Sequence, residues 1–312
     1  MAGNPSAPDT SADPGRSATV AAGGAAPARG GMLASLMLYR DYRELWTSSV
    51  LTQIGQWMLQ ITLGWLMLTY TDSAGFVGLI GFGSGIPFLI VALPAGVLID
   101  RVERRRLLVI CQATALAVGI GLAVLVSVGQ AGPWHLLTAA FINGLALAVN
   151  NTTRQTLVPT FVGREHLQNA VALMSAGQNV TRIAGPALAG PLIAAVGGGG
   201  ALYVPSFCLL VALLSTLRLP AAPPIAAEPA SLRRSLGEGI NVIVHNPVLS
   251  GLMLLAVIPT LLVFPYIQLL PVFARDVLRL GADGLGILMS AGGVGAVVGS
   301  LAIAAVQNLR RK

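Results

Sequence analysis

The segment GVLIDRVERRRLL, residues 96–108, places six charged side chains within the seven positions 100–106. The apolar runs on its two sides, near 76–98 and 107–129, are each long enough to cross a bilayer, since a transmembrane helix needs roughly 20 apolar residues. Only 10% of the residues in the chain are charged. Such a concentration between two apolar runs therefore indicates a loop at a membrane surface.

The composition of the whole chain extends this interpretation. Of its 312 residues, 54% are hydrophobic, a share that predicts a protein whose surroundings are mostly lipid. The apolar runs are continuous and do not alternate, so they predict helices and not the strands of a membrane barrel. The sequence therefore predicts an all-α integral membrane protein with eight spans. They lie near 45–69, 76–98, 107–129, 134–152, 170–196, 201–219, 248–270 and 285–306.

The positions of the arginines predict the orientation. Basic residues before the first span and after the second, fourth, sixth and eighth spans all fall on one side of the membrane, whereas the other side carries only Arg275 and Arg279. By the positive-inside rule, both termini are predicted to lie in the cytoplasm, in a multi-pass protein of the plasma (inner) membrane. The loop residues used for this assignment include Arg40, Arg43, Arg101, Arg104, Arg105, Arg106, Arg154, Arg164, Arg218, Arg310 and Arg311.

Other functional classes are disfavoured. The net charge of +7 comes from arginines in short loops, and no basic helix with interleaved aromatic residues is present to follow nucleic acid. His135, His166 and His245 lie in separate segments without a metalloprotease or serine hydrolase motif, so the sequence predicts neither an enzyme nor a metal or other cofactor. Cys111 and Cys208 fall in different apolar runs and are interpreted as small hydrophobic residues.

Charge alone does not explain Gly96 and Asp100, because an acid in a cytoplasmic loop opposes the topology signal. The segment from Gly96 to Arg106 resembles the loop motif between the second and third helices of the major facilitator superfamily, except that Glu103 stands where the family usually has glycine. The resemblance implies a latch that forms in one conformation and breaks in the other, with Asp100 accepting hydrogen bonds from arginines. The predicted latch residues are Gly96, Asp100, Arg101, Arg104, Arg105 and Arg154.

Two further stretches resemble the exporter branch of this superfamily that includes the enterobactin exporter. One is residues 39–46, YRDYRELW, and the other is residues 154–159, RQTLVP, followed by Glu165, Leu167, Asn169 and Ala170. The resemblance implies secondary active efflux of a small molecule, such as a siderophore, drug or metabolite, by alternating access with proton antiport. The expected partners are therefore the lipid bilayer, a small-molecule substrate and protons.

The fifth span contains AGPALAGP, residues 184–191, which is similar to the antiporter motif of the same superfamily. Proline removes a backbone donor and bends a helix, and flanking small residues let a neighbouring helix pack into the bend. Gly185, Pro186 and Gly190 are the candidate kink residues. Thr181 and Ala189 replace two glycines of the motif, and ordinary packing of small residues is the alternative interpretation.

An internal repeat gives the expected domain organisation. Residues 73–79, SAGFVGL, resemble 282–288, ADGLGIL, at an offset of roughly 207 residues. The expected parts are a disordered tail (1–31), a six-helix N-terminal bundle (32–219), a linker with an amphipathic helix (220–247) and two helices of a second bundle (248–312). Such a repeat would need four more spans to be complete, so the alternative is a truncated, transport-incompetent fragment, or a subunit that needs a partner.

Polar residues inside the spans are the candidates for a transport path. Arg182 falls about twelve residues into the fifth span, ~18 Å from its cytoplasmic start. Such an arginine is interpreted as an anion contact or as a structural residue paired with carbonyl groups or with Gln178 and Asn179. The sequence shows no acid well inside a span that could carry a proton. The other candidates, which share helical spacing and have helix–helix hydrogen bonding as their alternative role, are Gln53, Trp57, Gln60, Asn143 and Asn150.

Overall fold

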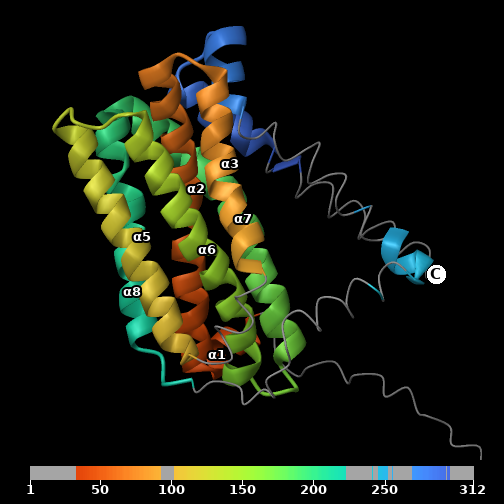
Figure 1. The fold of residues 1–312 in the computed structure, drawn as a ribbon. Coiled ribbons are helices and arrows are strands. Elements are labelled where there is room, and N and C mark those ends of the chain that lie inside the picture. The colour runs from red at the N-terminus through yellow and green to blue at the C-terminus, as the bar shows by residue number, and fades with distance from the viewer. Residues whose placement is uncertain are drawn as a thin grey trace, which may run out of the picture.

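The computed structural model describes residues 33–92, 102–222, 241, 245–251, 255, 269–292 and 294–295 of the chain. Over these residues it is a bundle of long helices that lie side by side, without any strand (Figure 1). The helical fold predicted from the continuous apolar runs is therefore confirmed. The helices are α1 (Ala34–Leu38), α2 (Arg40–Thr71), α3 (Ala74–Ala92), α5 (Arg104–Ser127), α6 (Pro133–Phe161), α7 (Leu167–Ala201) and α8 (Tyr203–Leu217).

Residues with left-handed backbone lie at the ends of the helices or interrupt them. Asp72, at the end of α2, adopts the left-handed conformation with φ 48°, and Gly129, between α5 and α6, has φ 73°. Inside α7 the helical dihedral angles are interrupted at Gly197, with φ 71° and ψ 171°, at the start of the four glycines. Because left-handed backbone is accessible mainly to glycine and, less often, to aspartate and asparagine, these residues set the ends of the helices.

Helix α2 lies at the centre of the bundle and packs against α3, α6, α7 and α8. Three clusters of buried apolar side chains contain residues of α2. One, which includes Met67 and Leu136, lies toward the α2 C-terminus, another, which includes Tyr42 and Leu157, lies toward its N-terminus, and the third includes Met58. Beyond its first two turns α2 carries no charged side chain, and most of this part of the helix is buried or half-buried.

The outward faces of the bundle carry large apolar side chains. Phe82, Ile110 and Phe207 are 63%, 60% and 64% exposed. In water, such exposure costs roughly 25 cal/mol per Å² of apolar surface, whereas contact with lipid tails carries no such cost. Within the described part of the chain, two helices are long and apolar enough by themselves to cross a membrane: Arg104–Ser127 and Leu167–Ala201.

The described part of the second repeat contains a turn followed by a helix. A π-helical turn, η1 (Phe273–Val277), is followed by helical residues from Ala282 to Gly292. Asp72 and Arg279 are the non-glycine residues with positive φ in the described chain, and they lie 207 residues apart, close to the offset of the repeated segments. The same left-handed turn therefore precedes α3 in the first repeat and the helix beginning at Ala282 in the second.

Several expectations fall wholly or partly outside the described residues. The tail 1–31 and most of the linker 220–247 lie outside them, and the seventh and eighth runs are described only in part. The domain boundaries and the number of eight spans therefore stay predictions.

Candidate functional site

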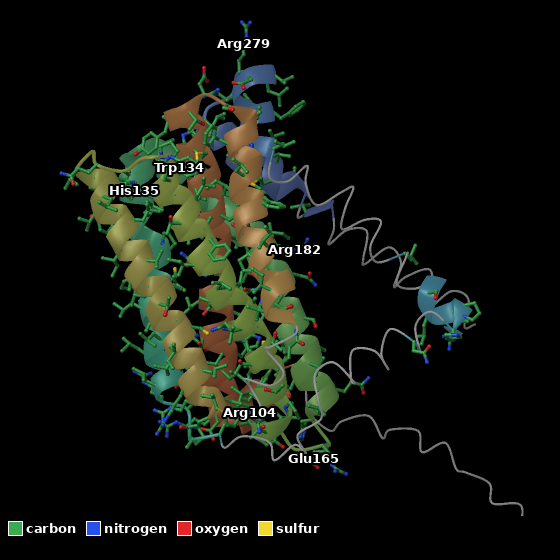
Figure 2. The ribbon with its side chains drawn as sticks, in the orientation of Figure 1. Arg104, Trp134, His135, Glu165, Arg182 and Arg279 are labelled. Atoms are coloured by element: carbon green, nitrogen blue, oxygen red, sulfur yellow. The ribbon has the colours of Figure 1, made fainter. Side chains whose placement is uncertain are left out.

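We call Arg104 and Arg105, at the start of α5, the arginine cluster. Arg104 lies at the end of the bundle that also carries Glu165, opposite the end that carries Trp134 and Arg279 (Figure 2). Arg104, 7% exposed, donates from Nη1 to the carbonyl oxygen of Thr156 at 3.0 Å, near the end of α6. Arg105 donates from Nη2 to the carbonyl oxygen of Leu217 at 2.6 Å, at the end of α8. Cations at helix C-termini are stabilised by the carbonyl groups that the helix leaves unpaired. The cluster therefore joins the start of α5 to two helix ends.

Glu103 stands where the superfamily usually has glycine, and its backbone conformation, with φ −56° and ψ 120°, is accessible to any residue. Its carboxylate pairs with Arg106 at 2.7 Å. The turn before α5 therefore does not depend on glycine. The predicted partners Gly96, Asp100 and Arg101 lie outside the described residues, so the latch itself stays a prediction.

One expectation about Arg154 is wrong. The sequence placed the end of the fourth span near residue 152 and Arg154 in the loop beyond it, whereas α6 continues to Phe161 and Arg154 lies within it, 3% exposed. Its Nη1 donates to Ser49 Oγ at 2.7 Å, while Nε and Nη2 have no hydrogen-bond partner among the described residues. Hydropathy missed this extension because Thr152 to Thr156 are polar, although one face of the segment is buried.

The two stretches that resemble the exporter branch pack against each other. Tyr42 donates from its hydroxyl group to the carbonyl oxygen of Ala170 at 2.7 Å, and Trp46 Nε1 donates to the carbonyl oxygen of Leu173 at 3.0 Å. Ser35 Oγ donates to Asn169 Oδ1 at 2.7 Å. The start of α2 is therefore fixed to the start of α7, and the residues that carry the resemblance form one interhelical contact.

Arg182 lies on α7 between the two ends of the bundle and is exposed (Figure 2). Its guanidinium carbon lies 5.8 Å from the centre of the Trp57 ring on α2, within the range of a cation–π interaction. It makes no hydrogen bond with Gln178 or Asn179 in the described chain, so the structural pairing considered from the sequence is not observed. Gln53 and Gln60, about one turn before and after Trp57, are partly exposed. We call Gln53, Trp57, Gln60 and Arg182 the polar strip.

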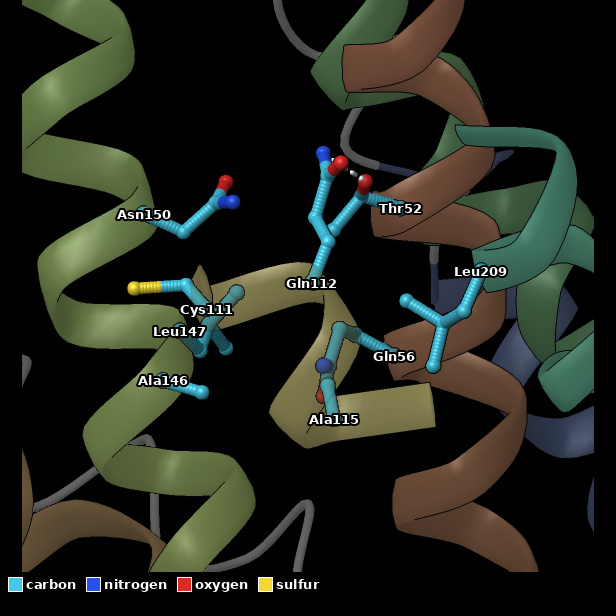
Figure 3. A pocket seen from close by; sticks show the side chains of 9 residues that line it. All are labelled: Thr52, Gln56, Cys111, Gln112, Ala115, Ala146, Leu147, Asn150 and Leu209. Carbon is cyan, nitrogen blue, oxygen red and sulfur yellow. Dashed lines mark hydrogen bonds between the residues drawn. The ribbon is translucent and has the colours of Figure 1, made fainter. Parts of the chain in front are cut away.

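Asn143 and Asn150 do not belong to the polar strip. They are 4% and 2% exposed, and Asn143 donates from Nδ2 to the carbonyl oxygen of Ala139 within its own helix. Asn150 lines a pocket between α2, α5, α6 and α8 (Figure 3). Its volume is about 10 Å³, room for roughly one water molecule, so it is too small for a transported molecule. Its lining residues are Thr52, Gln56, Cys111, Gln112, Ala115, Ala146, Leu147, Asn150 and Leu209.

A hydrogen-bond network borders this pocket and was not predicted. Gln112, 1% exposed, donates from Nε2 to Ser48 Oγ at 2.9 Å and to Thr52 Oγ1 at 3.3 Å. Ser48 Oγ in turn lies 2.7 Å from Thr216 Oγ1. The network joins α5, α2 and α8, and the only sequence signal for it is a glutamine inside an apolar run.

The glycines of the proposed kink motif are points of close helix contact. A Cβ added at Gly185 would overlap the Cβ of Trp57, and one added at Gly190 would lie 2.6 Å from the carbonyl oxygen of Ala282 and 2.8 Å from the Cα of Gly286. Dihedral angles stay helical from Leu167 through Pro186. Gly185 therefore faces α2, and Gly190 faces the second repeat.

A contact at the opposite end of the bundle also escaped prediction. Arg275 donates from Nη1 to the carbonyl oxygen of Leu68 at 3.1 Å, at the end of α2, and its Nη2 pairs with Asp72. The sequence marked Arg275 only as a basic residue on the other side of the membrane. Helical spacing could not predict Asp72 as the partner of Arg275, because the two residues lie in different repeats.

Comparison with known proteins agrees with this architecture. The transmembrane secretion effector family of the major facilitator superfamily matches residues 33–312. The chain is 27% identical to the staphyloferrin A transporter of Staphylococcus aureus, over 84% of this chain and 66% of that protein. It is 27% identical to the multidrug efflux pump Tap of Mycolicibacterium fortuitum, over 78% of this chain and 62% of that protein. It is 24% identical to the enterobactin exporter EntS of Shigella boydii, over 86% and 64%.

A bacterial homologue of the lysosomal transporter Spinster, solved in an inward-facing and unoccupied conformation, has a similar fold. The TM-score is 0.65 at 16% sequence identity, over 84% of this chain and 61% of that one. The chain thus spans about two thirds or less of the length of these relatives. Because the family match covers nearly all of the sequence and the fold agrees with it, the chain belongs to the transmembrane secretion effector family of the major facilitator superfamily.

Proposed function

We propose that this protein is a secondary active transporter that exports a small molecule by alternating access. The observation that carries the proposal is the position of the polar strip beside the contact between the two repeats. Arg182 lies one turn before Pro186 and two turns before Gly190 on α7, and Gly190 touches the second repeat at Ala282 and Gly286. Carriers of this kind hold their substrates near the middle of the membrane, between two repeats.

Alternating access requires contacts at each end of the bundle that can form and break, and two contacts are candidates for this role. At one end, Arg275 fastens the second repeat to the C-terminus of α2. At the other end, the proposed latch would join Asp100 to the arginines near the start of α5, with Arg104 and Arg105 already held by neighbouring helices. A contact that is made in one state and broken in the other shifts the equilibrium between the two states. Both termini are proposed to lie in the cytoplasm, at the arginine-rich end.

The names of the relatives support the proposed direction of transport. Proteins similar to this chain are named as a siderophore transporter, a multidrug efflux pump and an enterobactin exporter, so export of a siderophore, drug or other metabolite is proposed here. Proton antiport is part of the proposal. Asp41 and Glu44, the acids of α2, lie in its first two turns, so no described helix of the first repeat holds an acid deep in the membrane.

A deletion strain tests the proposal. Cells that lack the gene should accumulate at least one small molecule that the parent strain secretes, and expression of the 312-residue chain should restore its secretion in a manner that a protonophore abolishes. Mass spectrometry of cell extracts and medium measures both effects. As a control for expression, Arg164→Gln, which changes an exposed loop residue, should restore secretion equally.

Failure would take one of two forms. If the chain inserts in the membrane but restores nothing, while a version extended by four further spans does, the chain is a transport-incompetent fragment or a subunit. If neither version changes the distribution of any compound, the proposed transport is wrong.

A further inference from the structure

The interior of the described bundle has an unbalanced charge. In α2, α3, α5, α6, α7 and α8, the acidic residues are Asp41 and Glu44, both in the first two turns of α2. Away from the helix ends, the same helices carry two arginines, Arg154 and Arg182. Two positive charges therefore lie inside these helices with no acidic side chain beside them, in surroundings where charge is weakly screened.

The two guanidinium groups differ in what they can bind. Arg154 is buried and directed at Ser49. Arg182 is exposed, and the Trp57 ring is its one contact of a polar or cation–π kind among the described residues. A guanidinium group has five N–H donors in a planar fork, and a cation–π contact uses none of them. The donors of Arg182 are therefore free to bind an anion.

The direction that Arg182 faces is set by its neighbours on α7. Residues 182, 186 and 190 follow each other at intervals of one helical turn and so share a face. Gly190 on this face touches Gly286, and the carbonyl oxygen of Pro186 would lie 3.2 Å from a Cβ at Gly286. Arg182 therefore shares the face of α7 that contacts the second repeat at Pro186 and Gly190.

We propose that Arg182 binds a carboxylate, or a comparable oxyanion, of the transported molecule, whose flat or apolar body lies against Trp57. The inference rests on the proposed function and specifies the substrate class of its site. Gln53 and Gln60 lie about one turn to either side of Trp57 on α2, and their side-chain amides make no hydrogen bond within the described chain. They supply neutral donors and acceptors around the charged group. A cationic molecule would be repelled by Arg182 and by the wider positive charge of the interior.

Three small aromatic probes of similar size and different charge test the inference on the full chain in nanodiscs of neutral lipid. Benzoate is negative, benzamide is neutral and benzylamine is positive at neutral pH. Binding is measured by calorimetry and by tryptophan fluorescence. We expect benzoate to bind about tenfold or more tightly than benzamide, and benzylamine to bind least, since a hydrogen bond to a charged group contributes a factor of roughly this size.

Substitutions test whether the preference for benzoate depends on Arg182 and Trp57. Arg182→Gln should reduce the affinity for benzoate to that for benzamide, whereas Arg182→Lys should keep part of the preference for the anion. Trp57→Phe should reduce the affinities for benzoate and benzamide by a similar factor, because it changes the aromatic surface that the ligand contacts and not the charge of the site. Arg164→Gln removes the same charge from an exposed loop and should change nothing. The melting temperature of each variant shows that it is folded.

The inference is overturned if folded Arg182→Gln keeps the charge order of the native chain, or if native protein binds benzoate no better than benzamide. Its failure is distinct from that of transport. Charge-selective binding without any restored secretion contradicts only the proposed function, whereas restored secretion by Arg182→Gln without loss contradicts only the anion site.

Discussion

Arg154 and Arg182 are the same residue type in neighbouring helices of one bundle, yet their surroundings differ. Arg154 is 3% exposed and donates to Ser49, whereas Arg182 is exposed and rests on the Trp57 ring. A charge inside a membrane protein faces either protein or a wet cavity. Arg154 faces protein, and our proposal places Arg182 at the substrate path. The comparison suggests that Arg154 holds helices together and that Arg182 contacts what passes between them.

The polar residues around the two arginines differ in the same way. Those near Arg182 are partly exposed, and those near Arg154, such as Asn150, are enclosed. Single cysteines in a background lacking Cys111 and Cys208 test this difference. A membrane-impermeant maleimide should label Gln53→Cys and Gln60→Cys at least about tenfold faster than Asn143→Cys and Asn150→Cys, because only exposed thiols react readily. Equal labelling rates at all four positions would show that the two sets of residues do not differ in exposure.

Loss of Arg154 should reduce the stability of the protein more than loss of Arg182. Arg154→Ala leaves a cavity and removes the partner of Ser49, so we expect the free energy of unfolding in detergent to fall by about 2–4 kcal/mol. Arg182→Ala should change it by less than about 0.5 kcal/mol, as for other exposed residues. Thermal unfolding of the purified variants measures both.

A third variant, Arg154→Met, separates two contributions at the buried site. It fills the space without the cost of burying a charge, so it should recover most of the stability lost in Arg154→Ala. If Arg154→Met is as unstable as the alanine variant, the charge itself stabilises the bundle. If Arg182→Ala proves the less stable of the two alanine variants, the assignment of roles is reversed.

The last prediction concerns the close contact between Gly185 and Trp57. Gly185→Ala would place a methyl group into the Cβ of Trp57 and should cost about 1–3 kcal/mol through displacement of the ring from Arg182. Gly121→Ala in α5 is the matched control, because no atom lies within 4 Å of the added Cβ, and it should change stability by less than about 1 kcal/mol. Similar melting temperatures for both variants would show that the α2–α7 contact is looser than described.

The fold could be predicted from the sequence to a large extent. Six of the apolar runs correspond to α2, α3, α5, α6, α7 and α8, and the interruption of α7 at Gly197 falls between the fifth and sixth runs. Hydropathy failed where a helix continues past its apolar part. The ten residues of α6 from Thr152 onward are amphipathic and mostly polar, so their helical burial depends on neighbouring helices that a local window does not include.

The site could be predicted only as a set of candidates. Arg182 and Trp57 were both selected, but the contact between them was not, since they lie in different helices. The grouping of Asn143 and Asn150 with the residues of α2 rested on helical spacing, which gives the face of one helix and not the neighbour that this face meets. In the structure the two asparagines are buried, whereas the residues of the polar strip are partly or fully exposed.

By itself, the sequence determined that the chain is a helical membrane protein built on a repeat, because hydrophobic length, turn residues and motif spacing are local properties. Tertiary structure alone decided which arginine is enclosed and which is open, that Arg275 reaches the end of α2, and that Gly190 meets Gly286. These contacts join residues that are far apart in the chain, and their existence depends on how the helices pack against one another.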